Sequence, residues 1–225
     1  MIKVEHIETW GFEHAIRGMR NPLNSWGKSD SKLCKGKDFD DCTVDCVKCP
    51  RKDENFDNDI FCIGKADLDL MHRLYVAGQP HRKFLRQIFV SMDITASTYW
   101  LAELDTYRVG MTRNSCSFMH KGLSKPFELS DFSTHGYDKE YDYIIDKLND
   151  LRDKWLETKD NELFQQIRCL LPSGYNQRST YTMNYENVVN IIEYRTGHRL
   201  SEWNEFVDIL WELPYMKEIA GEVEE

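Results

Sequence analysis

The chain has 225 residues, of which 41% are hydrophobic and 30% are charged, a balance typical of a soluble globular protein with a full core. Its formal net charge of −9, from 29 basic and 38 acidic residues, argues against a general nucleic-acid binder but allows a local basic pocket for one phosphate. No hydrophobic run has the length of a membrane span, and the first residues lack the pattern of a secretory signal, so we expect a cytoplasmic protein without a membrane partner.

The first part of the chain predicts a strand, a loop and a polar insert. Residues 1–12 alternate hydrophobic and polar side chains well enough to indicate an opening strand and turn. Residues 15–31 mix Gly, Pro, Asn and Ser and therefore predict a loop. Residues 32–60 are highly polar and hold four cysteines, so we expect an insert at about 32–62 outside the core.

The middle of the chain predicts a short helix, a strand and a second helix. Asp67 is the expected N-cap of the short helix, whose hydrophobic face carries Leu68 and Met71 and which ends at residues 77–80. Residues 84–97 combine alternation with β-branched side chains and predict a strand. Residues 98–107 are compatible with a helix, and the small polar residues of 108–122 predict a loop.

The last third predicts four helices. Residues 141–157 carry hydrophobic side chains at helical spacing, and residues 161–171 form a second helix that Pro172 stops. A third helix starts at Asn184 or Tyr185 and ends at Gly197, and a fourth starts at Ser201. With strands mostly in the first half and helices mostly in the second, the sequence predicts an α+β fold in one domain over residues 1–225, with an antiparallel or mixed sheet flanked by helices.

The cysteine-rich insert suggests a metal. Cys42, Cys46 and Cys49 are close in sequence and Cys34 precedes them, so these four thiolates suit a tetrahedral structural zinc ion. Free cysteines in a polar loop explain the same pattern equally well. An iron–sulfur cluster also uses closely spaced cysteines. It is less favoured, because nothing else in the chain looks like an α/β barrel.

Three polar stretches carry groups that can bind an anion. Residues 108–120 contain an arginine, hydroxyls and an amide in a glycine-containing loop, and residues 78–86 gather several basic side chains. Arg178 stands in a polar stretch, and a helix is expected to follow at once and to add partial positive charge. The alternatives are solvated loops and an arginine that caps a neighbouring helix. No catalytic triad, Walker loop or dinucleotide fingerprint is present, so the sequence suggests no protein nucleophile.

These stretches together resemble the flavin-dependent thymidylate synthases over roughly residues 64–210. The second half of that family has a typical order of motifs, which this chain matches with Arg168, Leu171-Pro172, Arg178, Thr182-Met183-Asn184 and Tyr194-Arg195. Upstream, residues 78–84 resemble the Gly-His…Phe segment of the family, and residues 89–117 are similar to the segment that leads into its R-H-R-x-x-S-x-N-x-x-S signature.

The chain also departs from the family pattern. The signature's R-H-R is Thr106-Tyr107-Arg108 here, and its final arginine is Met119. Glu103 stands where the family uses a glutamine toward the nucleotide, and Phe206 lies near the position of a late arginine that contacts the pyrimidine. Each charged hydrogen bond lost in this way weakens anion binding by about 1.5–3 kcal/mol.

The resemblance implies reductive methylation of dUMP to dTMP with methylenetetrahydrofolate, FAD and NADPH, in a homotetramer. Reduced flavin supplies the hydride in that family, and the protein orients the reactants. Carried over by position, the residues toward the nucleotide are Arg178, Ser117, Asn114, Thr112 and Glu103, with Ser117 at its phosphate, and those along the flavin are His81, Arg108, Asn190 and Arg195. The altered signature leaves two alternatives open, namely a related enzyme for another pyrimidine nucleotide and a non-catalytic nucleotide-binding relative.

Overall fold

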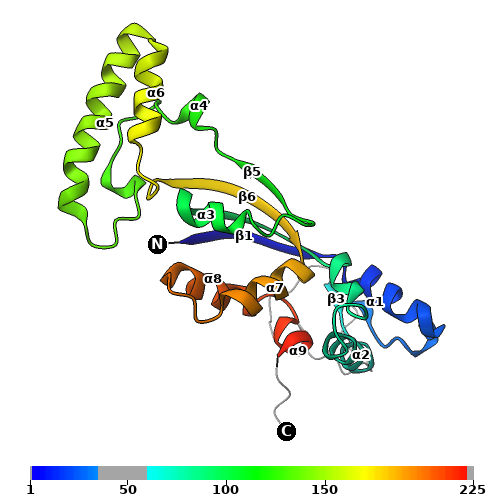
Figure 1. The fold of residues 1–225 in the computed structure, drawn as a ribbon. Helices are drawn as coiled ribbons and strands as arrows, with labels where there is room; N and C mark the ends of the chain where they lie inside the picture. Colours follow the sequence, from blue (N-terminus) through cyan, green and yellow to red (C-terminus); the bar gives the residue numbers. More distant parts are fainter. Residues whose placement is uncertain (1, 35–59, 222–225) are drawn as a thin grey trace. The chain divides into compact units, whose positions relative to one another are not determined.

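The computed structural model describes residues 2–34 and 60–221 and has an α+β fold, as the sequence predicts (Figure 1). Its main sheet has four strands in the order β1-β4-β6-β5. The strands are β1 (Lys3–Trp10), β4 (Phe89–Ser97), β5 (Thr112–Ser115) and β6 (Asn176–Asn184). Strands β5 and β6 are antiparallel, with Thr112 opposite Thr182 and Ser115 opposite Ser179. A separate antiparallel pair consists of β2 (Lys32–Cys34) and β3 (Ile60–Cys62).

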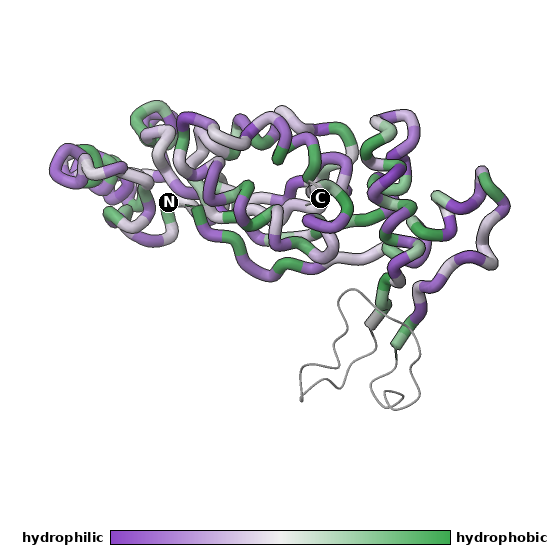
Figure 2. The backbone as a smooth tube through the Cα atoms, turned by 90° about the horizontal axis from the view of Figure 1, so that it is seen from below, coloured by the Kyte–Doolittle hydropathy of each residue, from purple (hydrophilic) through white to green (hydrophobic). Residues whose placement is uncertain are grey.

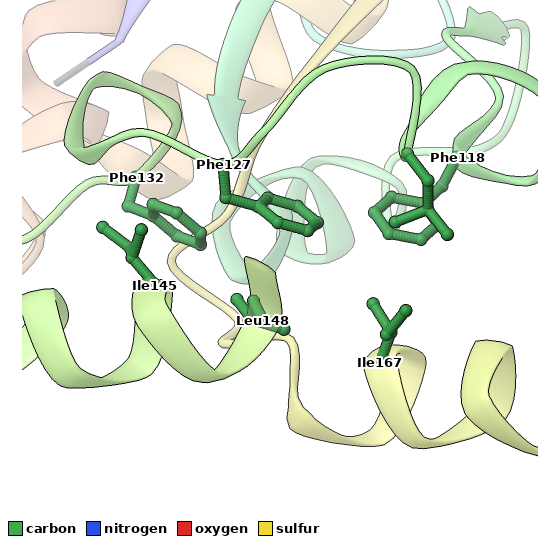
Figure 3. Close-up of a cluster of buried hydrophobic side chains, with 7 residues drawn as sticks. Phe118, Phe127, Phe132, Ile145, Leu148 and Ile167 are labelled. Atoms are coloured by element: carbon green, nitrogen blue, oxygen red, sulfur yellow. The ribbon is translucent and has the colours of Figure 1, made fainter. Parts of the chain in front are cut away.

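The chain folds into two compact units. The first comprises Met1–Ile7, Ser91–Thr182 and Leu200–Glu202, and it contains α3 (Thr98–Leu104), α4 (Phe118–Lys121), η5 (Leu129–Asp131), α5 (Asp138–Thr158) and α6 (Asn161–Leu170). Helices α5 and α6 pack side by side (Figure 1). A hydrophobic cluster joins them to α4 and the loop before α5, and it consists of Phe118, Leu123, Phe127, Phe132, Ile145, Leu148 and Ile167. The side chains labelled in Figure 3 point toward one another.

The second unit comprises Glu8–Val90, Met183–Arg199 and Trp203–Glu225, as far as these residues are described. It contains α1 (Phe12–Arg20), the short turns η1 (Asn21–Leu23) and η2 (Trp26–Lys28), α2 (Lys65–Val76), η4 (Lys83–Gln87), α7 (Tyr185–Arg195), most of α8 (Ser201–Trp211), and α9 (Met216–Ala220). Hydrophilic and hydrophobic residues are mixed along the coloured tube of Figure 2. None of the described helices is long and apolar enough to cross a membrane.

Helix α1 corrects the predicted loop at 15–31. Phe12, Ala15, Ile16 and Met19 are buried and share one face of the helix, a stripe that the nearby Gly, Pro and Asn residues obscured in the sequence. Gly18 lies inside this helix and not in a turn. A Cβ there would come within 2.4 Å of Gln87 Oε1, the end of a flexible side chain that can move aside.

Asp67 was expected to cap α2, and this expectation is wrong. Gly64 is the N-cap residue, and Asp67 lies in the first turn with a fully buried side chain. Its carboxylate accepts hydrogen bonds from Arg20 Nε at 2.5 Å and from Ser29 Oγ and Ser31 Oγ at 2.6 Å each. The residue therefore ties α2 to α1 and to the segment before β2.

The later helices agree with the predictions. Helices α5, α6, α7 and α8 occupy the expected segments, and Asn184 caps α7 by accepting a hydrogen bond from Asn187 N at 3.1 Å. Gly197 has the positive φ of 71° expected after a helix end. The predicted loop at 108–122 is wrong in part, because β5 and α4 form there, and the predicted strand at 84–97 begins only at Phe89. One domain with an insert at 32–62 stays a prediction.

Candidate functional site

Arg178 lies in the middle of β6, and α7 begins only at Tyr185, so the expectation that a helix follows Arg178 at once is wrong. Its guanidinium is about half exposed and donates to Asp93 Oδ2 at 2.7 Å. Thr180 Oγ1 donates to the other oxygen of Asp93 at 2.5 Å. The hydrogen bonds from Thr180 and then Arg178 lower the pKa of Asp93. Arg178 is therefore already paired within the sheet.

Ser117 lines a pocket of about 320 Å³ within the first unit. The described residues that line it are Thr98, Ser115, Cys116, Ser117, Phe118, Arg168, Leu171, Tyr175 and Gln177. Among the described residues, the lining includes four hydroxyl side chains and a guanidinium but no carboxylate. Such a set of donors suits an anion beside an aromatic wall.

Arg168 is the cation of this pocket, and its role at the site was not predicted from the sequence. Its guanidinium carbon lies 4.8 Å from the centre of the Phe118 ring. The guanidinium makes no hydrogen bond or ion pair with any residue that the structure describes. It can therefore receive an anion without first losing a partner, in contrast to Arg178. In the sequence, a role for Arg168 is indicated by its position one helical turn before the Leu171-Pro172 pair.

The other residues predicted to face the nucleotide lie nearby in the first unit. Thr112 and Asn114 are exposed on β5, opposite Thr182 and Thr180 of β6. Glu103 is half-buried on α3. Neither β5 residue is among those lining the pocket that holds Ser117, so the structure brings Ser117 together with Arg168 there and not with Thr112 or Asn114.

Arg108 is the one predicted flavin residue in the first unit. It is exposed, and its Nε donates to the carbonyl of Asp105 at 3.0 Å. Its other two nitrogens have no partner among the described residues. Together with Asp105, Met111 and Arg113 it lines a second pocket of about 330 Å³.

The other three predicted flavin residues lie in the second unit. His81 is exposed in the turn before η4, and Asn190 is half-buried on α7. Arg82, which the sequence analysis had grouped with His81, donates to Asn190 Oδ1 at 3.3 Å and to Glu186 Oε1 at 3.2 Å. The second oxygen of Glu186 is buried without a hydrogen-bond partner among the described residues.

Arg195 lies at the end of α7 with its guanidinium 4.3 Å from the centre of the Trp203 ring. Its Nη1 is 3.0 Å from His198 Nε2. Arg195 is therefore held by its neighbours in the second unit, as a cation stacked on an indole.

A cluster that the sequence did not indicate joins three segments of the first unit. Tyr99 donates its hydroxyl to Glu202 Oε1 at 2.6 Å, and His135 Nε2 lies 2.9 Å from the same oxygen. Burial and the carboxylate together raise the pKa of Tyr99 to about 12. Burial of Glu202 raises its pKa, but the hydrogen bond from Tyr99 and the neighbouring His135 outweigh this and lower it.

The predicted metal ligands Cys42, Cys46 and Cys49 lie outside the described residues. Cys34, the fourth, is buried at the end of β2, and Cys62 is buried on β3. Among residues 2–34 and 60–221 no group of three or more His, Cys, Asp or Glu side chains is arranged to hold a metal ion. A zinc site in the insert stays a prediction.

No family model matches the sequence, and no curated protein matches it. Solved structures do match it. One is thymidylate synthase X from Helicobacter pylori with FAD and dUMP, which is 16% identical and has a TM-score of 0.66 over 98% of this chain and 96% of that chain. Another structure of the Helicobacter pylori enzyme, also complexed with FAD and dUMP, has the same identity and TM-score over 97% of each chain. The chain therefore has the fold of the flavin-dependent thymidylate synthases.

Proposed function

We propose that this chain is a flavin-dependent thymidylate synthase-like enzyme that methylates dUMP reductively to dTMP, with methylenetetrahydrofolate, NADPH and FAD. The fold likeness supports the class of protein, and at 16% identity it carries nothing about activity. Self-association as a homotetramer belongs to the same proposal and rests on the family resemblance.

The observation that carries the proposal is the pocket around Ser117. The signature predicts that Ser117 meets the nucleotide phosphate, and the pocket that it lines holds an unpaired guanidinium and no carboxylate. A phosphate monoester carries close to two negative charges at neutral pH and needs several donors. We therefore assign the phosphate to Ser117 and Arg168. Arg178 is already paired with Asp93, and its predicted contact with the nucleotide is a second, separate proposal.

The side chains predicted to lie along FAD have hydrogen-bond donors that this cofactor needs. Arg108 has two nitrogens without a hydrogen-bond partner among the described residues, and His81 is an exposed imidazole. Asn190 accepts from Arg82 through its amide oxygen, so its amide nitrogen can still donate to a ligand. These donors fit the anionic diphosphate and the acceptor atoms of a flavin ring. The buried carboxylate of Glu186 has Arg82 as its counter-charge. Each of these donors, taken by itself, fits a part of the cofactor.

Bound flavin would supply the hydride, which agrees with the lack of a sequence pattern for a protein nucleophile. The tasks of the chain are then to bind and to orient. Arg168 and Ser117 hold the phosphate. The rings of Phe118 and Tyr175 line the same pocket. Arg108, His81 and Asn190 donate to the cofactor.

Nucleotide binding tests the two arginines against each other. Calorimetric titration with dUMP should show that Arg168→Met weakens binding by about tenfold or more, because a hydrogen bond to a charged group is lost. Arg178→Met should have a smaller effect, since it removes a residue already paired in the sheet. Arg199→Met is the control, as an exposed arginine without a partner in the described chain. A larger loss for Arg178→Met than for Arg168→Met would reverse the assignment.

Flavin binding is tested by the visible absorption spectrum of the purified protein after addition of FAD and removal of free cofactor. We expect the flavin bands to stay with the protein and to weaken in Arg108→Met. A protein that retains no flavin but still binds dUMP would be the non-catalytic nucleotide-binding relative, and the methylation proposal would fall.

A further inference from the structure

Arg113 lies on β5, and each of its three guanidinium nitrogens donates a hydrogen bond. Nη1 donates to Asp105 Oδ2 at 2.6 Å, and Nε donates to Ser179 Oγ at 3.1 Å. Nη2 donates to Gln177 Oε1 at 2.8 Å. The side chain is 23% exposed and is fixed from three directions. Arg113 does not itself line the pocket that holds Ser117, whereas Gln177 does.

These contacts leave only one orientation for the amide of Gln177. Its Oε1 accepts from Arg113, and its Nε2 donates to the carbonyl of Cys116 at 2.6 Å. A guanidinium can only donate and a carbonyl can only accept. A flipped amide would set N–H against N–H and oxygen against oxygen. The chemistry of the two neighbours therefore fixes the amide, independently of how its atoms are assigned.

The fixed orientation determines what the pocket can accept. An amide nitrogen carries two hydrogens, and the carbonyl of Cys116 takes one. The second hydrogen is left for a ligand, because Nε2 has no further partner among the described residues. Every charged or amide group lining this pocket then offers donors, namely the guanidinium of Arg168 and the N–H of Gln177, beside the hydroxyls.

We propose that Gln177 is a specificity-determining residue that selects a phosphate monoester in this pocket, and that Arg113 positions its amide for that purpose. The proposal rests on the proposed nucleotide function, and it names the group of the substrate that the pocket recognises. Without Arg113 only the carbonyl of Cys116 holds the amide, so the amide can rotate and its second N–H no longer stays directed at the phosphate. Arg113 therefore acts on selectivity without touching the ligand.

A double-mutant cycle tests this coupling. The measured quantity is the ratio of the affinities for dUMP and deoxyuridine, which differ only in the phosphate. We expect Arg113→Met and Gln177→Leu each to lower this ratio by about tenfold, the loss of one hydrogen bond to a charged group. In the Gln177→Leu background, Arg113→Met should lower it no further. Arg113→Lys, which can still donate to Gln177 Oε1, should restore part of the ratio, and Arg199→Met should leave it unchanged.

An equal loss from Arg113→Met in both backgrounds would overturn the inference, because a general structural effect does not depend on Gln177. If Arg113→Met does not fold, Gln177→Glu replaces it in the test. That carboxylate still accepts from Arg113 but cannot donate to Cys116 or to a phosphate, so the ratio should fall at least as far as in Gln177→Leu. A wild-type ratio in Gln177→Glu would equally overturn the inference.

A readout without ligand separates this inference from the proposed function. In the NMR spectrum of the free protein, the side-chain amide protons of Gln177 should exchange slowly and should change in shift and exchange in Arg113→Met. Unchanged signals would show that Arg113 does not position the amide. If the wild type has no preference for dUMP while the NMR result is as expected, the phosphate function fails and the positioning by Arg113 stands.

Discussion

At the scale of single residues, the buried pair of Arg20 and Asp67 leads to a prediction about stability. The two side chains are 5% and 0% exposed and are joined at 2.5 Å. Asp67 also accepts from the backbone N–H groups of Asp30 and Ser31. Such a pair matters most when one partner is removed, because the other charge then stays buried without compensation.

We expect Asp67→Asn to lower the free energy of unfolding by about 3–5 kcal/mol, because Arg20 loses its counter-charge. Urea unfolding followed by circular dichroism measures this loss. Asp69→Asn, on the exposed side of the same helix, is the matched control and should change the stability by less than about 0.5 kcal/mol. A loss of similar size in both variants would show that the ion pair contributes nothing beyond a surface charge.

The same pair predicts how stability depends on pH. Burial raises the pKa of Asp67, but the hydrogen bonds from Ser29, Ser31 and Arg20 outweigh it, so the folded-state pKa lies below the ordinary value. The contribution is therefore complete above the unfolded pKa of about 3.9 and is lost as the pH falls through the lower folded value. Urea midpoints of the wild type and Asp67→Asn should differ by a constant amount near neutrality and converge in acid. A gap that widens in acid would contradict this.

At the scale of elements, the sequence predicts those whose periodicity is long and uninterrupted. Helices α5, α6, α7 and α8 follow from their spacing of hydrophobic residues. Helix α1 was missed because Gly18 and the following Asn-Pro suggested a loop, although Gly18 lies inside the helix. Strand β5 has only four residues, too few for a recognisable alternation.

The sequence predicted the part of the candidate site that lies in one local motif, and it missed the residues that come from other elements. Ser117 follows from a local motif. Its neighbour Arg168 comes from another element, and Arg113 meets Gln177 only through the register of β5 against β6. The sequence does not state that register, because the two strands are far apart along the chain.

The N-terminus of α7 offers a prediction at the scale of one element. Asn184 accepts from Asn187 N and donates its own N–H to Asn187 Oδ1, which closes a capping box. Asn184→Ala should lower the stability by about 1 kcal/mol, whereas Asn184→Ser, which keeps an acceptor, should retain most of it. Thermal unfolding of the two variants decides this. Equal losses would mean that the side chain does not act as a cap.

At the scale of the whole molecule, the chain keeps the fold of the flavin-dependent thymidylate synthases at 16% identity while its signature has changed. Most of an α+β fold is specified by hydrophobic pattern and packing, which tolerate extensive substitution. A site is specified by single donors, so its changes alter chemistry directly. The pocket with Arg168, Ser117 and Gln177 is where we propose that a nucleotide binds.

We propose that this chain converts dUMP to dTMP, and the most direct test is chromatographic measurement of dTMP formed from dUMP, methylenetetrahydrofolate, NADPH and FAD. We predict dTMP in the complete mixture and none when FAD or NADPH is omitted, with a lower rate for Arg168→Met than for Arg199→Met. Absence of dTMP from a folded protein that retains FAD and binds dUMP would contradict the claim.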